Sequence, residues 1–205
     1  GDPCATLDET AEAWRSWAAM HWGDDGGYDG EYRDLVRRSA MVLQGLTYYP
    51  SKSVAAALTT SVPERMGGSW NWDYRYAWLR DASFMMHAMW VAACPTEPEG
   101  FFHWIDIAAG RSEESKVQIV YGLEGERDLA ERELPHLEGF NGSKPVRVGN
   151  EAWKQVQLDV LGEVLDAAWQ LDMSVHQWSP VTRGLLMRFA DFAADHWRDV
   201  DAGMW

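Results

Sequence analysis

The feature that most constrains this sequence is the stretch over residues 69–88, which reads SWNWDYRYAWLRDASFMMHA. It begins with five aromatic rings within nine residues: Trp70, Trp72, Tyr74, Tyr76 and Trp78. Arg80 and Asp81 follow directly, and an apolar run comes after them. A plain core segment uses Leu, Ile and Val, and it rarely buries Arg and Asp without partners. The stretch is therefore expected to build a site or to fasten a loop.

The chemistry of these residues leaves two interpretations open. Aromatic faces can pack against the C–H surface of a sugar, while Arg and Asp can form paired hydrogen bonds with neighbouring hydroxyls. Alternatively, the rings form a cluster that fastens a loop to the start of a helix. Asp81 has a structural alternative of its own, because a carboxylate in the first turn of a helix is favoured by the dipole and the free N–H groups.

Apolar residues recur at helical spacing in six parts of the chain, which predicts six helices and an all-α fold. The helices are expected over 7–22, 35–46, 81–92, 101–109 and 151–171, and from Ser179 and Pro180 to just before Asp201. Ser179 and Pro180 are a good start signal, because Ser caps a helix and Pro suits its first position. The third helix is expected to bury a stripe of Phe84, Met85, Ala88, Met89 and Ala92.

Two loops interrupt the helical pattern. Residues 47–79 are expected to be non-helical, and loops of this length are uncommon in compact domains unless they build a site. A second loop, GFNGSKPVRVGN at 139–150, is rich in turn residues. Between them, residues 117–121 are apolar and partly alternating and precede Gly122 and Gly125, which predicts a small β-hairpin.

Charge and cysteine content narrow the choice of partners. A formal charge of −14 argues against nucleic acid and against an anionic membrane surface, and it is neutral toward uncharged sugars. No apolar run approaches the roughly 20 residues that a spanning helix needs. Cys4 and Cys94 make neither a disulfide framework nor a metal site, and they predict free thiols in a reducing cytoplasm. The histidines lack metal-ligand spacing, so no metal or cofactor is expected.

The segment NWDYRYAWLRDAS at 71–83 resembles the signature of the glucoamylase family of inverting glycoside hydrolases, which also contains bacterial trehalases. Three further segments resemble the same family in the same order: LTTSVPE at 58–64, YGLEGERDLAERELPHLEGFNGSKPVRVGN at 121–150, and QVQLDVLGEVLDA at 155–167. The resemblance extends over most of the chain from about Tyr32 onward.

The resemblance implies an (α/α)6 toroid, of which residues 1–205 are expected to be roughly the first half, with long loops and a small β-hairpin. In the family the general acid lies in a Trp-Glu pair after a helix and a short Asp/Gly turn, which DVDAGMW at 199–205 resembles. The acid is therefore expected immediately after Trp205, and the base further downstream. The chain is expected to be inactive alone, with the C-terminal half of the same polypeptide as its missing partner.

The resemblance also implies which residues grip the terminal sugar. Arg80 and Asp81 look like the pair that hydrogen-bonds its hydroxyls, and Tyr74 and Trp78 look like ring walls of the first subsite. Three more residues are expected around the pocket: Arg147 and Lys144 at the rim, and Trp205 on the floor. Other carboxylates in the chain, such as Asp73 and Asp159, are interpreted as structural, because nothing pairs them across a bond.

The function predicted first is the exo-acting release of glucose from α-linked glucans, with an oligosaccharide or disaccharide as substrate. A trehalase of the same family is the alternative, because both kinds share all four segments. A third hypothesis, from another class, is a non-catalytic carbohydrate-binding helical module, which the aromatic loop would also suit.

Overall fold

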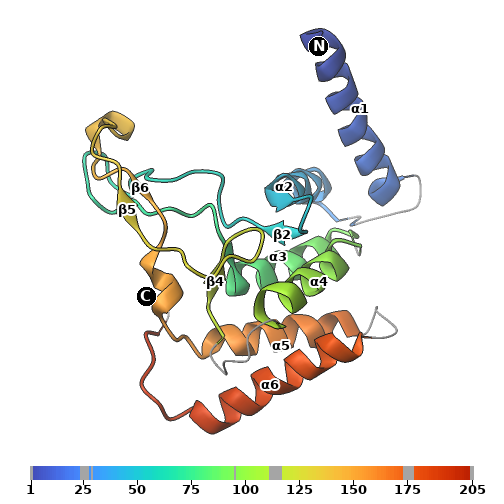
Figure 1. Cartoon of the computed structure of the whole chain (residues 1–205). Coiled ribbons are helices and arrows are strands. Elements are labelled where there is room, and N and C mark those ends of the chain that lie inside the picture. Colours follow the sequence, from blue (N-terminus) through green and yellow to red (C-terminus); the bar gives the residue numbers. More distant parts are fainter. Residues whose placement is uncertain are drawn as a thin grey trace.

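The computed structural model of the chain is mostly helical (Figure 1). It describes residues 2–23, 28, 30–94, 96–110, 117–172 and 178–203. These residues contain six α-helices, as predicted: α1 (Pro3–Trp22), α2 (Arg33–Leu46), α3 (Leu79–Val91), α4 (Thr96–Gly110), α5 (Asp159–Asp172) and α6 (Pro180–His196). Two 3₁₀ turns, η1 (Phe140–Gly142) and η2 (Glu151–Lys154), lie in the later loops.

Four helices enclose the main hydrophobic core. α3 packs against α4 and α5, and α6 packs against the same two helices. Phe101 and Trp104 of α4, Val164 of α5 and Phe189 of α6 are all fully buried between them. The burial of these side chains supplies the main stabilisation of this part of the chain.

α1 lies at the edge of the molecule, away from α5 and α6 (Figure 1). Trp17 and Trp22 at its C-terminal end pack on a small cluster that includes Ala40 of α2 and Met89 of α3. Trp22 Nε1 also donates a hydrogen bond to the Ala92 carbonyl at 2.8 Å. The tryptophans near its end therefore attach α1, while most of its length is exposed.

Six two-residue strands form three antiparallel pairs: β1 (Thr47–Tyr48) with β2 (Ser53–Val54), β3 (Ala77–Trp78) with β4 (Val120–Tyr121), and β5 (Arg132–Glu133) with β6 (Arg147–Val148). The hairpin predicted around residues 117–125 is wrong, because β4 does not pair with the segment that follows it. β4 does precede a turn, but it pairs with β3, because Ala77 and Tyr121 are both fully buried in the core. Among the described residues, neighbouring segments do form a hairpin at β1–β2.

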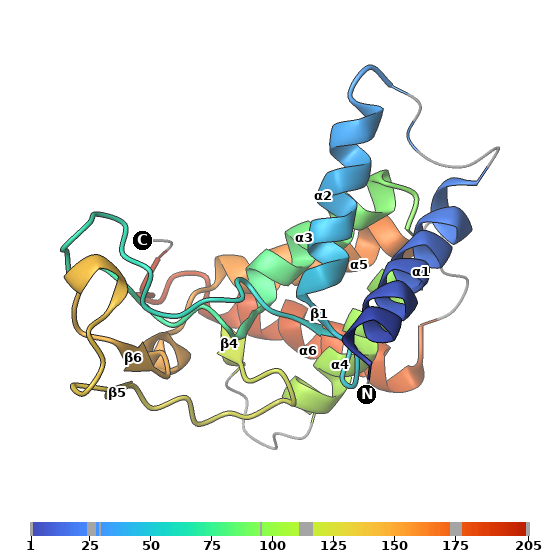
Figure 2. The same ribbon diagram turned by 90° about the horizontal axis from the view of Figure 1, so that it is seen from above.

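The long non-helical stretch is confirmed, since residues 47–78 are all described and contain no helix. Figures 1 and 2 show that β1 and β2, at the start of this stretch, lie next to α2, whereas its later part extends to β5, β6 and η1, at the end of the helical core that is remote from α1. Two long loops gathered at one end of a rigid scaffold are a common setting for a functional site.

The buried face of α3 differs from the predicted stripe. Phe84 is 56% exposed and Ala88 is also exposed, whereas the buried positions are Leu79, Ala82, Ser83, Met86 and Met89. The cause is the way the chain enters the helix. The Leu79 N–H donates to the Ile119 carbonyl at 3.0 Å, which points Leu79 into the core and sets the face that follows at helical spacing.

α5 begins later than predicted, at Asp159 instead of Glu151. The Asn150 side chain caps a short 3₁₀ turn by accepting a hydrogen bond from the Ala152 N–H. The chain then continues without regular structure to Leu158, so Gln155 and Gln157 lie outside the helix.

Ser179 caps α6, as predicted, and its Oγ accepts a hydrogen bond from the Thr182 N–H at 3.0 Å. Replacement of Ser179 by alanine is expected to lower the free energy of unfolding by about 1 kcal/mol, because the amide loses its partner. Denaturant titration measures this, with Ser179→Thr as the control that keeps the hydroxyl. Equal stability of the alanine variant and the wild type would show that the cap contributes nothing.

Candidate functional site

Arg80 and Asp81 lie in the first turn of α3, where the buried pairing of β3 with β4 fixes the entry of the chain. Trp78 is the N-cap residue of this helix, and its side chain makes no capping hydrogen bond. The first turn therefore presents two charged side chains, and the Leu79 N–H of this turn donates to the Ile119 carbonyl.

The Arg80 side chain is 13% exposed and reaches the start of α5. Its Nη1 donates to Gln157 Oε1 at 2.8 Å and to Asp159 Oδ2 at 3.0 Å. Gln157 is buried, and its Nε2 donates to Gln155 Oε1 at 2.9 Å. Gln157 was not predicted as a partner of Arg80. The available signal was the segment 155–167, which carries Gln157 and Asp159 together.

Burial raises the pKa of the Asp81 carboxyl above its ordinary value, although the charge of Arg80 and a backbone N–H act in the opposite direction. The effect of burial therefore outweighs that of the helix dipole and the N–H groups, which stabilise the charge of a carboxylate at a helix start. A partly buried carboxyl with a perturbed pKa is typical of functional sites.

Tyr74 lies within reach of the charge of Asp81. Burial raises the pKa of the Tyr74 hydroxyl, and the negative charges of Glu64 and Asp81 raise it further. Glu64 belongs to the segment 58–64, in which no site residue was predicted. The contacts of Tyr74, Arg80 and Asp81 with a sugar stay a prediction.

The extended segment before Tyr74 has two different faces. Asn71 and Asp73 are fully buried, whereas Trp70 is 66% exposed and Trp72 is partly exposed. The rings of Trp70 and Trp72 lie 6.4 Å apart between centroids. Because side chains alternate along an extended chain, both rings are on the same side as Tyr74.

Trp78 is 3% exposed and belongs to the main hydrophobic core. Its ring packs among apolar side chains, which accounts for an aromatic residue at this position without a ligand. The predicted role of Trp78 as a ring wall of the sugar site rests on the family resemblance and stays a prediction.

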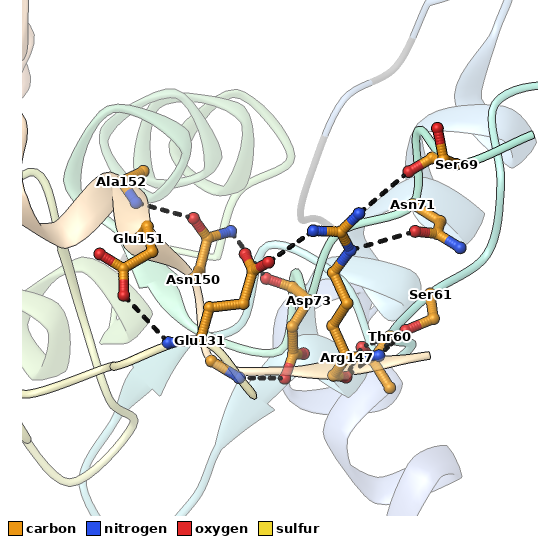
Figure 3. Close-up of polar contacts among 11 residues, drawn as sticks. Thr60, Ser61, Ser69, Asn71, Asp73, Glu131, Arg147, Asn150, Glu151 and Ala152 are labelled. Atoms are coloured by element: carbon orange, nitrogen blue, oxygen red, sulfur yellow. Dashed lines mark hydrogen bonds and ion pairs between the residues drawn. The ribbon is translucent and has the colours of Figure 1, made fainter. Parts of the chain in front are cut away.

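Arg147 joins the two long loops, as Figure 3 shows. Its Nε donates to Asn71 Oδ1 at 3.3 Å, its Nη2 donates to the Ser69 carbonyl at 3.3 Å, and its Nη1 pairs with the Glu131 carboxylate. All three guanidinium nitrogens therefore donate to protein groups. This network gives Arg147 a structural role, and its predicted place at the pocket rim stays a prediction.

The Thr60 and Ser61 side chains hold the backbone of Arg147 (Figure 3). Thr60 Oγ1 donates to the Arg147 carbonyl at 2.7 Å, and the Arg147 N–H donates to Ser61 Oγ at 2.7 Å. Both residues belong to the segment 58–64. Their hydroxyls fix the position of the first loop relative to β6.

Asp73, which is fully buried, also connects the first loop to the second. Its two carboxylate oxygens accept from Arg75 Nε at 2.9 Å and Nη2 at 2.8 Å, and Oδ2 also accepts from the Gly149 N–H at 3.2 Å. Gly149 has φ +89°, and a Cβ there would lie 2.2 Å from the Ala130 carbonyl oxygen, so only glycine fits. These contacts support the structural interpretation of Asp73.

Two predicted residues remain, Lys144 and Trp205. Lys144 is exposed in the second loop and precedes a cis peptide bond to Pro145. Trp205 lies outside the described residues. The contacts predicted for both stay predictions.

A groove of about 380 Å³ lies elsewhere, and it contains no predicted site residue: it is lined by Trp14, Asp34, Arg37, Arg38, Met41 and Val42. Within the described ranges, no group of three or more His, Cys, Asp or Glu side chains could hold a metal ion. None of the helices in those ranges combines the length and apolar character needed to cross a membrane.

Comparison with known proteins identifies the family. Residues 30–205 match the family described as Glycosyl hydrolases family 15. The chain belongs to this family. A trehalase from Mycolicibacterium smegmatis is 40% identical over 199 residues, and the match covers 96% of this chain and 29% of the relative. A trehalase from Mycobacterium tuberculosis is 40% identical over 200 residues, with the same coverage of both chains.

Solved structures support the fold of this family 15 chain. A structure named Glycosidase Wild Type superposes with a TM-score of 0.54 at 19% identity, and the match covers 84% of this chain and 44% of that one. The expected all-α fold, roughly the first half of an (α/α)6 toroid with long loops, is confirmed. The chain spans 29% of the length of the two mycobacterial relatives.

Proposed function

We propose that the full-length protein is a trehalase and that this chain supplies residues that bind one glucose unit of the substrate. The observation that carries the proposal is the placement of Arg80 and Asp81 side by side in the first turn of α3, in a chain of glycosyl hydrolases family 15. The charge of Asp81 also raises the pKa of Tyr74. The curated relatives described above are named trehalases, which favours trehalose over the α-linked glucans that we predicted first.

The chemistry of the cluster suits an uncharged sugar. Arg80 presents fixed N–H donors and Asp81 presents acceptor oxygens, so that two neighbouring hydroxyls can each find a partner. A site that is built to bond hydroxyls rejects analogues that lack them, because its buried polar groups would then lose their partners. The cluster therefore selects the sugar.

The bond cleavage is assigned to other groups. Inverting glycosidases use two carboxyl groups about 6.5–9.5 Å apart, one as general acid and one as general base. Asp159 is paired with Arg80, and we assign Asp81 to hydroxyl binding. We propose that the acid and the base come from parts of the protein other than this cluster, with the acid directly after Trp205.

The test is glucose release by the full-length protein from trehalose and, separately, from maltotriose. We expect a higher kcat/KM for trehalose. A clear preference for maltotriose would overturn the trehalase proposal in favour of a glucan-hydrolysing enzyme. Sugar binding without release of glucose from either substrate would favour the non-catalytic binding module.

A further inference from the structure

Arg80 takes its position from residues 155–159, which we call the link segment: residues 155–158 are irregular, and Asp159 is the first residue of α5. Gln157 Oε1 and Asp159 Oδ2 both accept from Arg80 Nη1, at 2.8 and 3.0 Å. These two acceptors flank Leu158 in the sequence. A shift of the backbone at Leu158 would therefore move both partners of the guanidinium at once.

The orientation of the Gln157 amide is also fixed. Gln157 is 2% exposed, and its Nε2 donates to Gln155 Oε1 at 2.9 Å, which leaves Oε1 directed at Arg80. A buried amide that is bonded at both ends loses a hydrogen bond if it turns over. The link segment thus holds the guanidinium through a side chain that has little freedom of its own.

The turn after α6 holds the backbone of the link segment. The Leu158 N–H donates to Asp201 Oδ2 at 2.9 Å, and the Ala202 N–H donates to the Val156 carbonyl at 2.8 Å. Asp201 Oδ1 also accepts from the Gly203 N–H at 3.0 Å, which fixes the carboxylate in the turn. Because most of the link segment lies between η2 and α5, these bonds satisfy backbone groups that regular structure would otherwise pair.

We propose that Asp201 is a positioning residue for Arg80, which we assign to sugar binding. Asp201 fixes the Leu158 amide, the link segment then fixes Gln157 and Asp159, and these two acceptors fix Arg80. Sugar affinity at Arg80 is thereby coupled to the turn that follows α6. This inference rests on the proposed function for a sugar at Arg80, but it does not depend on whether trehalose is the substrate.

The test compares glucose affinity in variants of the full-length protein by isothermal titration calorimetry. Asp201→Asn and Gln157→Met are each expected to weaken glucose binding by roughly ten-fold. This is the effect of losing one hydrogen bond to a charged group: Gln157→Met removes an acceptor of Arg80, and Asp201→Asn weakens the bond that holds the link segment in place. The double variant is expected to bind about as weakly as Gln157→Met alone, because both changes act through one path. Asp199→Asn, an exposed aspartate in the same turn, is the matched control and should keep wild-type affinity.

Unchanged glucose affinity in Asp201→Asn would overturn the inference, as would additive losses in the double variant or an absence of glucose binding in the wild type. A fall in melting temperature without a change in affinity would give Asp201 a purely structural role. If Asp201→Asn is too unstable to titrate, Asp201→Glu, which displaces the carboxylate by one methylene, is measured under the same criteria. Wild-type glucose binding without release of glucose from trehalose or maltotriose would reject the proposed function while these affinities still decide the inference.

Discussion

Replacement of Asp81 by alanine in the full-length protein is expected to lower kcat/KM for trehalose by at least about 100-fold. The change removes a carboxylate that we assign to hydroxyl bonding, and each hydrogen bond to a charged group contributes about 1.5–3 kcal/mol. Steady-state kinetics measures the effect. The matched control is Asp34→Ala, because Asp34 lies in the first turn of α2, away from the cluster, and is exposed.

The stability of Asp81 variants separates binding from capping. Because burial raises the pKa of Asp81, the folded state holds its proton more tightly than the unfolded state. Stability is then lost as the pH rises through the window between the ordinary pKa of 3.8 and the raised pKa. Asp81→Asn should therefore be at least as stable as the wild type at neutral pH, with no advantage well below pH 3.8. A less stable variant with normal turnover would instead support the capping role.

Replacement of Asp73 by alanine is expected to lower the free energy of unfolding by about 3 kcal/mol, because a buried carboxylate and its charge-assisted bonds are lost. The Asp73 side chain is 0% exposed, and it serves both Arg75 and the Gly149 amide. We also expect faster proteolysis of residues 139–150, since Asp73 fastens that loop. Denaturant titration and limited proteolysis measure the two effects.

Asp128→Ala is the matched control for Asp73. Asp128 Oδ1 accepts from the Ala130 N–H at 3.1 Å, just as Asp73 Oδ1 accepts from the Arg75 N–H at 3.2 Å, but Asp128 is exposed. Its loss should cost far less stability. Similar losses in the two variants would show that the turn bond, and not the buried ion pair, carries the contribution of Asp73.

The helices could be predicted from the sequence because their signals are local. Ser179 and Pro180 mark the start of α6 within two residues, and the structure has the cap at that place. The buried face of α3 could not be predicted in the same way. It depends on the bond from Leu79 to Ile119, a residue of a distant segment. The pairing of β3 with β4 is non-local for the same reason.

The candidate site shows the same contrast between local signals, which are readable from the sequence, and non-local contacts, which are not. The composition of residues 69–88 indicated a cluster around Arg80 and Asp81, because rings and charges are concentrated there. The partners of Arg80 were missed, since Gln157 is 77 residues away and nothing local marks it as buried. Arg147 was predicted at the rim of the pocket, which stays a prediction. Its contacts with Ser69, Asn71 and Glu131 are non-local, and no local signal marks them.

The most direct test of the account is a crystal structure of the full-length protein with glucose bound. We expect a glucose ring whose hydroxyls lie within hydrogen-bonding distance of the Arg80 guanidinium and the Asp81 carboxylate, beside Tyr74. A glucose bound elsewhere, with Arg80 and Asp81 in contact only with protein groups, would contradict it.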